Sequence, residues 1–306
     1  MKVCFLILHY NEIELTKKAV ESIVKMSGER EIVIVDNCSP NGTGEELVKL
    51  YDNNDSDVNI HVLLNKENGG FAKGNNVGYT FIKNNIPTDF VVALNNDIQF
   101  VQTDFVEELE RIYTGCEKKF FLAGPDVYTP HIRSHISPIA VKVRDKEAIE
   151  AIIKVNNDRI GQSKKVASLS TFFRYIQEKY QNSTVLRAYN SLRRKEYSAA
   201  VHYSTVAYDC VLNGACLIFD RQYIEKYDQL FEEATFLYGE EDFLTYRLVC
   251  NNEGIRYCPE LKTLHVGEGS AGYTTMNYSQ YCDKIARTSK VVNEALQVYI
   301  DYIEEK

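Results

Sequence analysis

Stretches of consecutive apolar residues alternate with segments of helical periodicity along the first hundred residues. Four apolar stretches have the length and β-branched content of buried strands, at residues 3–8, 31–35, 58–63 and 90–94. Helical spacing of apolar residues lies between them, at 14–26, 45–51 and 77–84. Strands that are apolar throughout are covered on both faces. The alternation therefore predicts an α/β fold in which helices flank a mainly parallel central sheet.

Each predicted strand ends in polar residues. These segments are His9-Tyr10-Asn11, Asp36-Asn37-Cys38-Ser39, Asn65 to Asn76 and Asn95-Asn96-Asp97. Open α/β sheets bind ligands at the carboxyl ends of their strands, so we expect these loops to converge on one site. A carboxylate flanked by amides, as at Asp97, suits a divalent cation that also holds phosphate oxygens. An Asn-rich turn explains the same residues without any chemistry.

The segment from Asn68 to Asn76 contains three glycines just before a predicted helix. It is not a P-loop, because Gly74 is followed by Asn75 and not by Lys-Ser or Lys-Thr, and it lacks the dinucleotide G-x-G-x-x-G spacing. Its glycines would let a ligand approach the backbone closely at a helix N-terminus. The alternative is a glycine-rich turn that caps the helix.

The middle of the chain is basic. From His131 to Ala200 there are fourteen Lys and Arg against six Asp and Glu, whereas the whole chain has a net charge of −8. Apolar residues recur there at helical spacing, with basic residues between them: Leu169, Phe172, Phe173, Ile176 and Tyr180, with Arg174 and Lys179. A basic amphipathic helix of this kind binds anionic lipid headgroups. The alternative is a helical insertion that packs on the main domain with its charges solvated.

Sheet-like patterning resumes after Ser204. A strand is predicted at 211–220, a helix at 243–251, an apolar run that ends at His265, and an amphipathic helix at 281–306. Glu240-Glu241-Asp242 opens the first of these helices, where acidic residues favour the helix dipole and where one could also act as a general base. His265 is either a structural residue or a ligand for a divalent metal.

Composition narrows the classes of function. Apolar content of 44% and charged content of 25% are ordinary for a globular protein, and the net charge of −8 argues against nucleic acid as a partner. The eight scattered cysteines form no C-x-x-C pair, which favours buried free thiols in a reducing cytoplasm. No signal peptide is evident, and no stretch approaches the ~18 apolar residues of a membrane span.

The order of these motifs resembles the family-2 glycosyltransferases of GT-A fold, particularly bacterial rhamnosyltransferase-like members that build surface polysaccharides such as capsule and O-antigen. The later motifs are Asn213-Gly214-Ala215, Tyr238-Gly239-Glu240-Glu241-Asp242 and His265. The resemblance covers Met1 to about Asp126 and about Asp209 to Ser270, and it leaves the basic middle and the C-terminal tail outside.

The resemblance implies roles at individual positions. His9, Tyr10, Asn11 and Asp36 would hold the nucleotide, with the Asp36 carboxylate accepting from a pyrimidine N3–H. The nucleotide-sugar pocket would also be lined by residues of the glycine-rich segment and the fourth strand end: Asn68, Gly69, Gly70, Lys73, Asn75, Asn95 and Asn96.

Asn95-Asn96-Asp97 would correspond to the family's Asp-x-Asp motif, with Asn95 in place of the first Asp. Asp97 and His265 would then bind a Mg²⁺ or Mn²⁺ cofactor. The Glu-Asp base motif of the family aligns with Glu241 when counted back from Arg247, while letter matching selects Asp242. We expect Glu241 to be the base, with Glu240 and Asp242 as alternatives.

The expected activity is inverting transfer of a sugar from a dTDP- or UDP-linked donor to a glycan acceptor carried on a lipid. The expected location is the cytoplasm, with peripheral association at the inner face of the plasma membrane. A nucleotidyltransferase, or a catalytically inactive GT-A-like binding protein, remains the alternative.

The resemblance, together with the basic middle segment and the helical pattern of the tail, predicts a division of the chain into four parts. Residues 1–130 would form the nucleotide-sugar-binding half, 131–205 a basic helical insertion, 206–275 the acceptor and catalytic half, and 276–306 a C-terminal helix.

Overall fold

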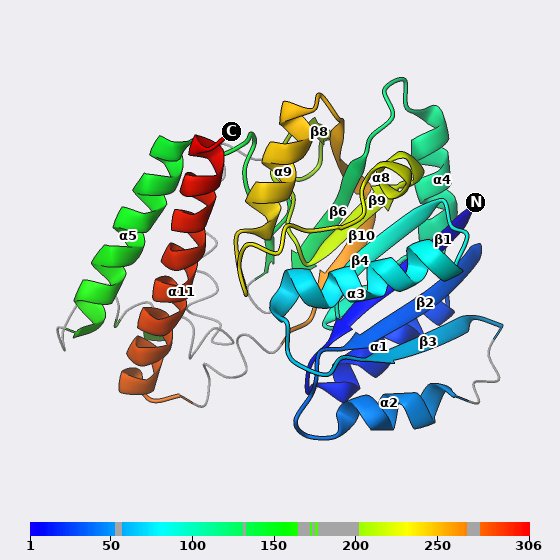
Figure 1. Ribbon diagram of the computed structural model, residues 1–306, viewed down its shortest axis with the longest axis horizontal. Coiled ribbons are helices and arrows are strands. Elements are labelled where there is room, and N and C mark those ends of the chain that lie inside the picture. Colours follow the sequence, from blue (N-terminus) through cyan, green and yellow to red (C-terminus); the bar gives the residue numbers. More distant parts are fainter. Residues whose placement is uncertain (53–56, 131–132, 165–171, 173–174, 177–201, 268–275) are drawn as a thin grey trace. The chain divides into compact units, whose positions relative to one another are not determined.

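The computed structural model describes residues 1–52, 57–130, 133–164, 172, 175–176, 202–267 and 276–306 (Figure 1). Contacts divide the chain into two compact units. The first comprises residues 1–143, 203–236 and 240–266, and the second comprises residues 144–202, 237–239 and 267–306. Most of the basic amphipathic segment predicted around Leu169 to Tyr180, and the basic residues from Arg187 to Lys195, lie outside the described residues.

The first unit is built on a single mixed sheet. Its strands are β1 (Lys2–His9), β2 (Glu29–Asp36), β3 (Asn59–Leu64), β4 (Phe90–Asn95), β5 (Ile98–Phe100), β6 (Leu122–Thr129), β7 (Ser134–His135), β8 (Ala207–Tyr208), β9 (Cys216–Asp220) and β10 (Ile255–His265). The strand order is β3-β2-β1-β4-β9-β6-β10-β5, with β7 beside β6 and β8 beside β10. The first four strands along the chain are confirmed to within two residues at each end.

Parallel pairing holds β3, β2, β1 and β4 together. β9 then enters antiparallel between β4 and β6, and β6 pairs in parallel with β10. The predicted α/β fold with a mainly parallel central sheet is confirmed, and the antiparallel strand β9 joins its two parallel parts.

Helices cover both faces of this sheet (Figure 1). They are α1 (Ile13–Val24), α2 (Thr43–Tyr51), α3 (Gly70–Asn85), α4 (Phe105–Gly115), α8 (Arg221–Lys226) and α9 (Glu240–Cys250). One buried cluster joins the sheet to α1, α2 and α4, and a second joins it to α3, α8 and α9. Alternate residues of β1 enter the two clusters, for example Phe5 the first and Leu6 the second, as the pleat of a strand requires.

Helix α3 begins seven residues earlier than predicted, so most of the glycine-rich segment is helix. Gly70 has φ of +79°, and a Cβ there would lie 2.1 Å from the Phe236 carbonyl oxygen. Only glycine accepts both constraints. The Phe71 N–H donates to the same oxygen at 3.0 Å. This contact with a distant part of the chain starts the helix, and local sequence did not reveal it.

The strand predicted at 211–220 is shorter in the structure, where β9 starts at Cys216. The Asn213 side chain accepts from the Ala215 N–H at 2.9 Å and donates to the Ile136 carbonyl at 3.2 Å. An Asn that bonds the backbone two residues on closes a turn and competes with strand pairing. The residues before β9 therefore form a turn at the sheet's edge.

In the second unit, α5 (Lys146–Lys164) lies against α11 (Tyr278–Glu304). Asn156, which is buried, donates to Asn293 Oδ1 at 2.9 Å, and Lys146 pairs with Glu304. Asn277 and Gln280 form a capping box at the start of α11. No helix among the described residues is long and apolar enough to cross a bilayer.

Gly78→Ala should destabilise the first unit. A Cβ at Gly78 would lie 2.2 Å from Leu6 Cδ1 and 2.7 Å from Val35 Cγ2, because α3 lies directly on the sheet there. Overpacking of this kind costs about 1–3 kcal/mol and outweighs the ~1 kcal/mol that alanine gains in a helix. Urea unfolding should show a lower midpoint. Gly115→Ala in α4, where a Cβ meets nothing within 4 Å, is the matched control. Equal midpoints for the two variants would contradict this view of the α3 contact.

Candidate functional site

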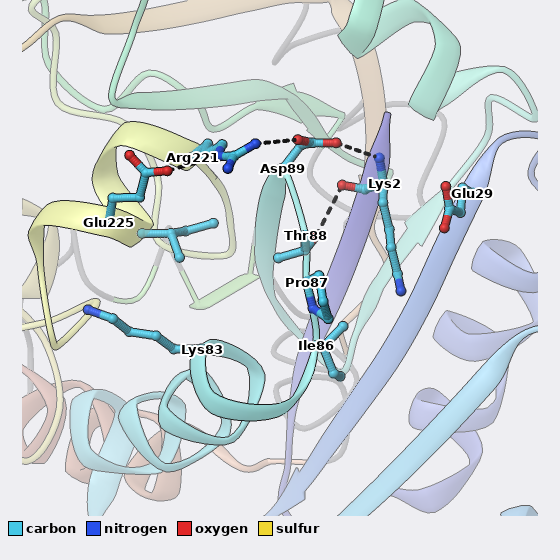
Figure 2. Close-up of a pocket in the computed structure, with 10 residues that line it drawn as sticks. Lys2, Glu29, Lys83, Ile86, Pro87, Thr88, Asp89, Arg221 and Glu225 are labelled. Carbon is cyan, nitrogen blue, oxygen red and sulfur yellow. Dashed lines mark hydrogen bonds and ion pairs between the residues drawn. The ribbon is translucent and has the colours of Figure 1, made fainter.

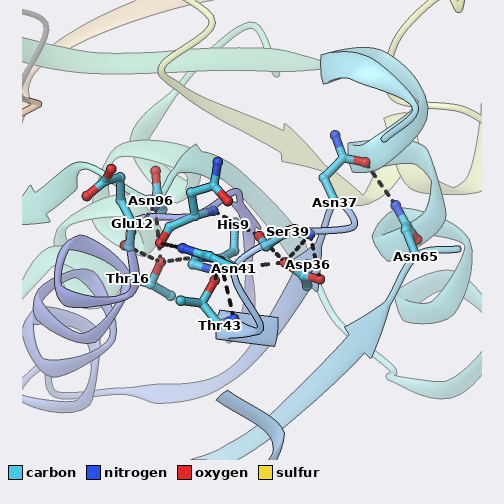
Figure 3. A network of polar contacts seen from close by, with 11 residues as sticks. His9, Glu12, Thr16, Asp36, Asn37, Ser39, Asn41, Thr43, Asn65 and Asn96 are labelled. Carbon is cyan, nitrogen blue, oxygen red and sulfur yellow. Dashed lines mark hydrogen bonds and ion pairs between the residues drawn. The ribbon is translucent and has the colours of Figure 1, made fainter. Parts of the chain in front are cut away.

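The ends of β1 and β2 are joined by a compact polar network (Figure 3). The Asp36 carboxylate accepts from the Ser39 N–H at 3.2 Å and from the Ser39 hydroxyl at 2.5 Å. The Ser39 Oγ accepts from the Asn11 N–H at 2.8 Å, which ties the two loops together. Asn11 and Cys38 both adopt positive φ, at 65° and 60°. These loops are therefore held in a tight, defined shape at the strand ends.

His9 lies at the centre of this network and is fully buried. Its Nδ1 is 2.7 Å from Thr16 Oγ1, and its Nε2 is 2.9 Å from Thr43 Oγ1. The Thr43 hydroxyl donates to Asn41 Oδ1 at 2.7 Å, so it accepts from Nε2–H of His9. Burial lowers the pKa of His9, and the Asp36 carboxylate 3.8 Å away partly opposes this effect. His9 thus supports Asp36 and the loops, while the half-exposed Tyr10 presents its ring outward.

Asn37 connects the β2 end to the start of α3. Its amide nitrogen donates to Asn68 Oδ1 and to the Gly70 carbonyl, each at 2.9 Å. Its amide oxygen accepts from the Gly69 N–H and from Asn65 Nδ2, each at 3.2 Å. All four hydrogen bonds that an Asn amide readily makes are present. The predicted residues Asn68, Gly69 and Gly70 therefore lie beside the loop of Asp36.

Asn75 and Lys73, the other two predicted residues of this segment, lie in different surroundings. Asn75 is buried and donates to the Phe71 carbonyl inside α3, which is a structural contact. Lys73 is on the surface and pairs with Glu67 at 2.6 Å, which raises the pKa of its ammonium group. Only Lys73 of the two is placed to meet a ligand without a change of structure.

Asn95, Asn96 and Asp97 follow the end of β4, as predicted. Asn96 donates to Thr16 Oγ1 at 3.2 Å, which links this turn to the network around His9. The Asn95 side chain is half-buried and makes no hydrogen bond to the described part of the chain. The Asp97 backbone carbonyl accepts from the Val266 N–H at 2.9 Å. The end of β10, the last strand along the chain, thus lies beside this turn.

Asp97 and His265 lie side by side. Asp97 Oδ2 is 3.2 Å from His265 Nε2, and both side chains are about one-fifth exposed, at 18% and 23%. Pairing of His265 with Ile98 across β10 and β5 produces this contact. Mg²⁺ and Mn²⁺ sites in proteins often use one or two protein ligands and take the rest from phosphate and water. Within the described residues no group of three or more metal-ligating side chains exists, so this pair fits only a cation shared with a bound diphosphate.

Antiparallel pairing of β9 with β4 brings a third loop to the same edge. The Asn95 N–H donates to the Ala215 carbonyl at 3.0 Å. The neighbouring Gly214 N–H donates to Glu241 Oε1 at 3.0 Å. A Cβ at Gly214 would lie 2.7 Å from that oxygen, so the close approach needs glycine. Glu241 therefore contacts the turn before β9, and that turn contacts the residues that lead to Asp97.

The three consecutive carboxylates at the start of α9 differ in exposure. Glu240 and Asp242 are buried, whereas Glu241 is half-exposed. This difference favours Glu241 as the group that meets a substrate. Arg247 does not contact the cluster among the described residues, because it hydrogen-bonds to Glu232, to the Tyr223 hydroxyl and to the Leu230 carbonyl.

A surface pocket of about 470 Å³ lies at the opposite edge of the sheet, by the amino ends of β1 and β4 (Figure 2). None of the predicted site residues lines it. Its cations already have carboxylate partners: Lys2 with Glu31, Lys83 with Asp228, and Arg221 with Glu225. A pocket of paired charges offers little to an anionic ligand, and we assign the chemistry to the other edge.

Several contributors to the site were not recognised in the sequence. Thr16 and Thr43 come from α1 and α2 and hold His9. Gly44 is required because a Cβ there would lie 2.3 Å from Asp36 Oδ2. Ser39 was noted as part of a polar loop end, but nothing in the local pattern indicated that it holds Asp36. The roles of these residues become visible only when the folded structure places them around His9 and Asp36.

The sequence model described as "Glycosyl transferase family 2" matches residues 4–201. The match therefore extends through the basic middle segment, which the sequence resemblance had left outside. No curated protein matches the chain.

Solved structures with the same fold include glycosyltransferases. S. aureus TarS 1–349 in complex with UDP-GlcNAc matches with a TM-score of 0.53 and 14% identity over 99% of this chain and 73% of that one. S. aureus TarS 1–349 alone gives 0.52 and 14%, over 94% and 69%. GalNAc-T7 with UDP, GalNAc and Mn²⁺ gives 0.51 and 10%, over 87% and 44%. At these identities the likeness shows the fold, which is GT-A.

The buried His9 should make the first unit sensitive to acid. Its folded-state pKa is lowered below 6.5, so the unfolded state takes up the proton first as the pH falls through about 6.5. The free energy of unfolding should therefore fall between pH 7.5 and pH 5.5, and His9→Asn should remove part of that fall. Urea unfolding of both proteins at the two pH values measures the difference. An unchanged fall in the variant would show that other groups cause the acid sensitivity.

Proposed function

The chain belongs to glycosyl transferase family 2, and on this premise we propose that it transfers a sugar with inversion from a nucleotide diphosphate to a glycan acceptor. One observation carries the proposal. The Asp97–His265 pair and the Glu241 carboxylate come together at the carboxyl edge of the sheet, beside the loops of Asp36 and Asn68. A cation site, a base and a nucleotide pocket at one edge are the parts that such a transfer needs.

The donor would bind at the ends of β1, β2 and α3. We assign the nucleobase to the Asp36 loop, where the buried carboxylate keeps lone pairs beyond those used by Ser39 and can accept a pyrimidine N3–H. The half-exposed ring of Tyr10 is available for stacking. The structural relatives were solved with UDP and UDP-GlcNAc, which supports a uridine or thymidine diphosphate sugar.

The reaction would be a single displacement. Glu241 takes the proton of an acceptor hydroxyl, whose oxygen forms a bond to the anomeric carbon as the bond from that carbon to the diphosphate breaks. Asp97 and His265 would hold Mg²⁺ or Mn²⁺, which neutralises charge on the departing diphosphate. The Gly214 N–H fixes the Glu241 carboxylate, so its position is set before the acceptor arrives. The relative solved with Mn²⁺ supports this cofactor.

We further propose a lipid-linked acceptor in the synthesis of a bacterial surface polysaccharide, with rhamnose among the candidate sugars. The support is the surplus of basic residues between His131 and Ala200, which suits the anionic headgroups of a membrane surface. Residues 131–205 remain our proposed insertion between a nucleotide-sugar-binding half at 1–130 and a catalytic half at 206–275, with a C-terminal helix at 276–306.

Glu241→Gln should abolish transfer and leave donor binding intact. A general base contributes about 100-fold or more to a rate, and the amide cannot take the proton. UDP-, dTDP- and GDP-sugars are first screened by thermal shift with Mn²⁺, and release of nucleoside diphosphate is then measured with the stabilising donor. Binding of UDP to the variant should be unchanged within about twofold.

Glu225→Gln is the matched control, since Glu225 is an exposed helical carboxylate at the opposite edge of the sheet. Asp97→Asn should instead weaken Mn²⁺-dependent binding of UDP. Release of pyrophosphate from a nucleoside triphosphate would favour a nucleotidyltransferase. An absence of reaction and binding with every nucleotide sugar would leave a non-catalytic binding protein.

Membrane association should depend on the basic middle segment. Replacing Arg193, Arg194 and Lys195 with Gln removes three charges, each worth about 1 kcal/mol at an anionic surface. Sedimentation with vesicles of anionic phosphatidylglycerol should show about tenfold or greater loss of binding, and binding should fall with salt. These substitutions spare Ile136 and Ser137, which contact Asn213. Equal sedimentation of the two proteins would contradict the proposed membrane contact.

A further inference from the structure

A second polar cluster lies near the carboxyl end of β6, where β7 pairs with it, apart from the residues assigned above. The Asp126 carboxylate is buried at 3% exposure, and its Oδ1 is 2.6 Å from His135 Nδ1. Its Oδ2 accepts from Lys262 Nζ at 3.0 Å. A buried carboxylate that holds one ring nitrogen sets the orientation of the imidazole. Here it leaves the other nitrogen, Nε2, pointing away from Asp126.

Aromatic rings flank this histidine. The Tyr203 ring stacks on the His135 ring with centroids 5.1 Å apart and planes at 19°, and Tyr128 meets it edge-on at 5.1 Å. The His135 side chain is 40% exposed, and its Nε2 has no hydrogen-bond partner in the described part of the chain. The cluster therefore presents an oriented ring nitrogen beside two partly exposed aromatic rings.

The cluster lies on the side of the sheet that carries Glu241. Asp126 and Tyr128 alternate with Val127 along β6, so they share a face with Leu122, which is buried with Leu244 and Leu248 of α9. Glu241 is in the first turn of that helix.

Hydrogen bonds between backbone and side-chain atoms join the residues after β7 to the turn that holds Glu241. Ser137 Oγ accepts from the Asn213 N–H at 3.3 Å, and the Ile136 carbonyl accepts from the Asn213 side chain at 3.2 Å. The next residue, Gly214, holds Glu241. The two residues that follow His135 and the proposed base Glu241 therefore all contact the turn at Asn213 and Gly214.

A sugar ring has both features that this cluster can bind, a hydroxyl group and a C–H face. A neutral imidazole nitrogen accepts from a hydroxyl, and a protonated one donates to it, so Nε2 can bind a sugar hydroxyl in either state. The negative face of an aromatic ring attracts the C–H face of a pyranose, as it attracts the positive edge of another ring. A pocket that combines such rings with a few fixed polar groups is typical of sites for small polar ligands.

We propose that His135, oriented by Asp126 and stacked on Tyr203, forms the subsite for the acceptor sugar. The inference rests on the proposed function, because it assigns the acceptor to the Glu241 side of the transfer. His135 is a positioning residue in this assignment: its Nε2 hydrogen-bonds one acceptor hydroxyl and so directs another toward Glu241. The Tyr203 ring covers one face of the sugar.

The test uses the full chain saturated with UDP and Mn²⁺ and a panel of methyl glycosides, whose aglycone is too small to stack on Tyr203. Methyl glucoside, galactoside, N-acetylglucosaminide and rhamnoside are titrated by ligand-observed NMR. His135→Ala should weaken the bound glycoside about tenfold, as expected for loss of one hydrogen bond. The affinity for UDP should stay within twofold. His135→Gln, whose amide can still bond a hydroxyl, should recover part of the loss.

His61→Ala is the matched control. His61 also pairs with a carboxylate, Glu31 at 3.1 Å, and lies beside the Phe81 ring, but it is on β3 near the far end of the sheet. It should leave glycoside affinity unchanged. Absence of glycoside binding to the wild type, or equal affinity in His135→Ala, would overturn the inference while UDP binding keeps the proposed function. Failure of UDP to bind would overturn both.

Discussion

The antiparallel pairing of β9 with β4 is the constraint on which the candidate site depends. It places the Ala215 carbonyl on the Asn95 N–H, so the turn at Asn213 and Gly214 lies beside the turn that carries Asp97. Because the Gly214 N–H binds Glu241, a helix from late in the chain is tied to a strand end from early in it. Shifting this pairing by one residue would turn every side chain of β9 to the other face and would separate the two carboxylates.

Neutral amides and hydroxyls hold together the loops that we propose for the donor. Asn37 uses its whole amide to join the β2 loop to α3, and buried His9 joins β1 to the threonines of α1 and α2. Asn76 does the same further along α3: it accepts from the Leu230 and Phe231 N–H groups and donates to the Phe231 carbonyl. Satisfied polar groups of this kind are rigid, because leaving any of them unpaired would cost about 1–3 kcal/mol.

The amino and carboxyl ends of the strands differ in whether their charged and polar groups already have partners in the chain. At the amino ends of β1 and β4 the cations around the pocket are neutralised by carboxylates of the chain. At the carboxyl ends, the Asn95 side chain makes no hydrogen bond to described residues, and His135 has one ring nitrogen without a partner among them. Function in open α/β sheets is found at the carboxyl edge because loops from several strands meet there. In this protein the groups that we propose for the donor, the base and the acceptor all lie at that edge.

The sequence by itself determined the first four strands, their polar ends and the fold class. Apolar runs such as Phe90 to Leu94 are local signals, and so is the change to Asn95-Asn96-Asp97. The order of the polar segments was enough for the resemblance to family-2 glycosyltransferases, which the family match confirms at the level of the family. The exposure that favours Glu241 over its two neighbours was not visible there, because three adjacent carboxylates have the same local pattern.

Only the tertiary structure decided which partners these residues have. Helix α3 begins at Gly70 because the carbonyl of Phe236 meets it there, and His9 is buried because hydroxyls from two helices surround it. β9 runs antiparallel because of where the chain re-enters the sheet, and His135 meets Asp126 only when β7 folds back on β6. The physical reason is the same in each case: hydrogen bonds and packing join residues far apart along the chain, and a local pattern carries no record of them.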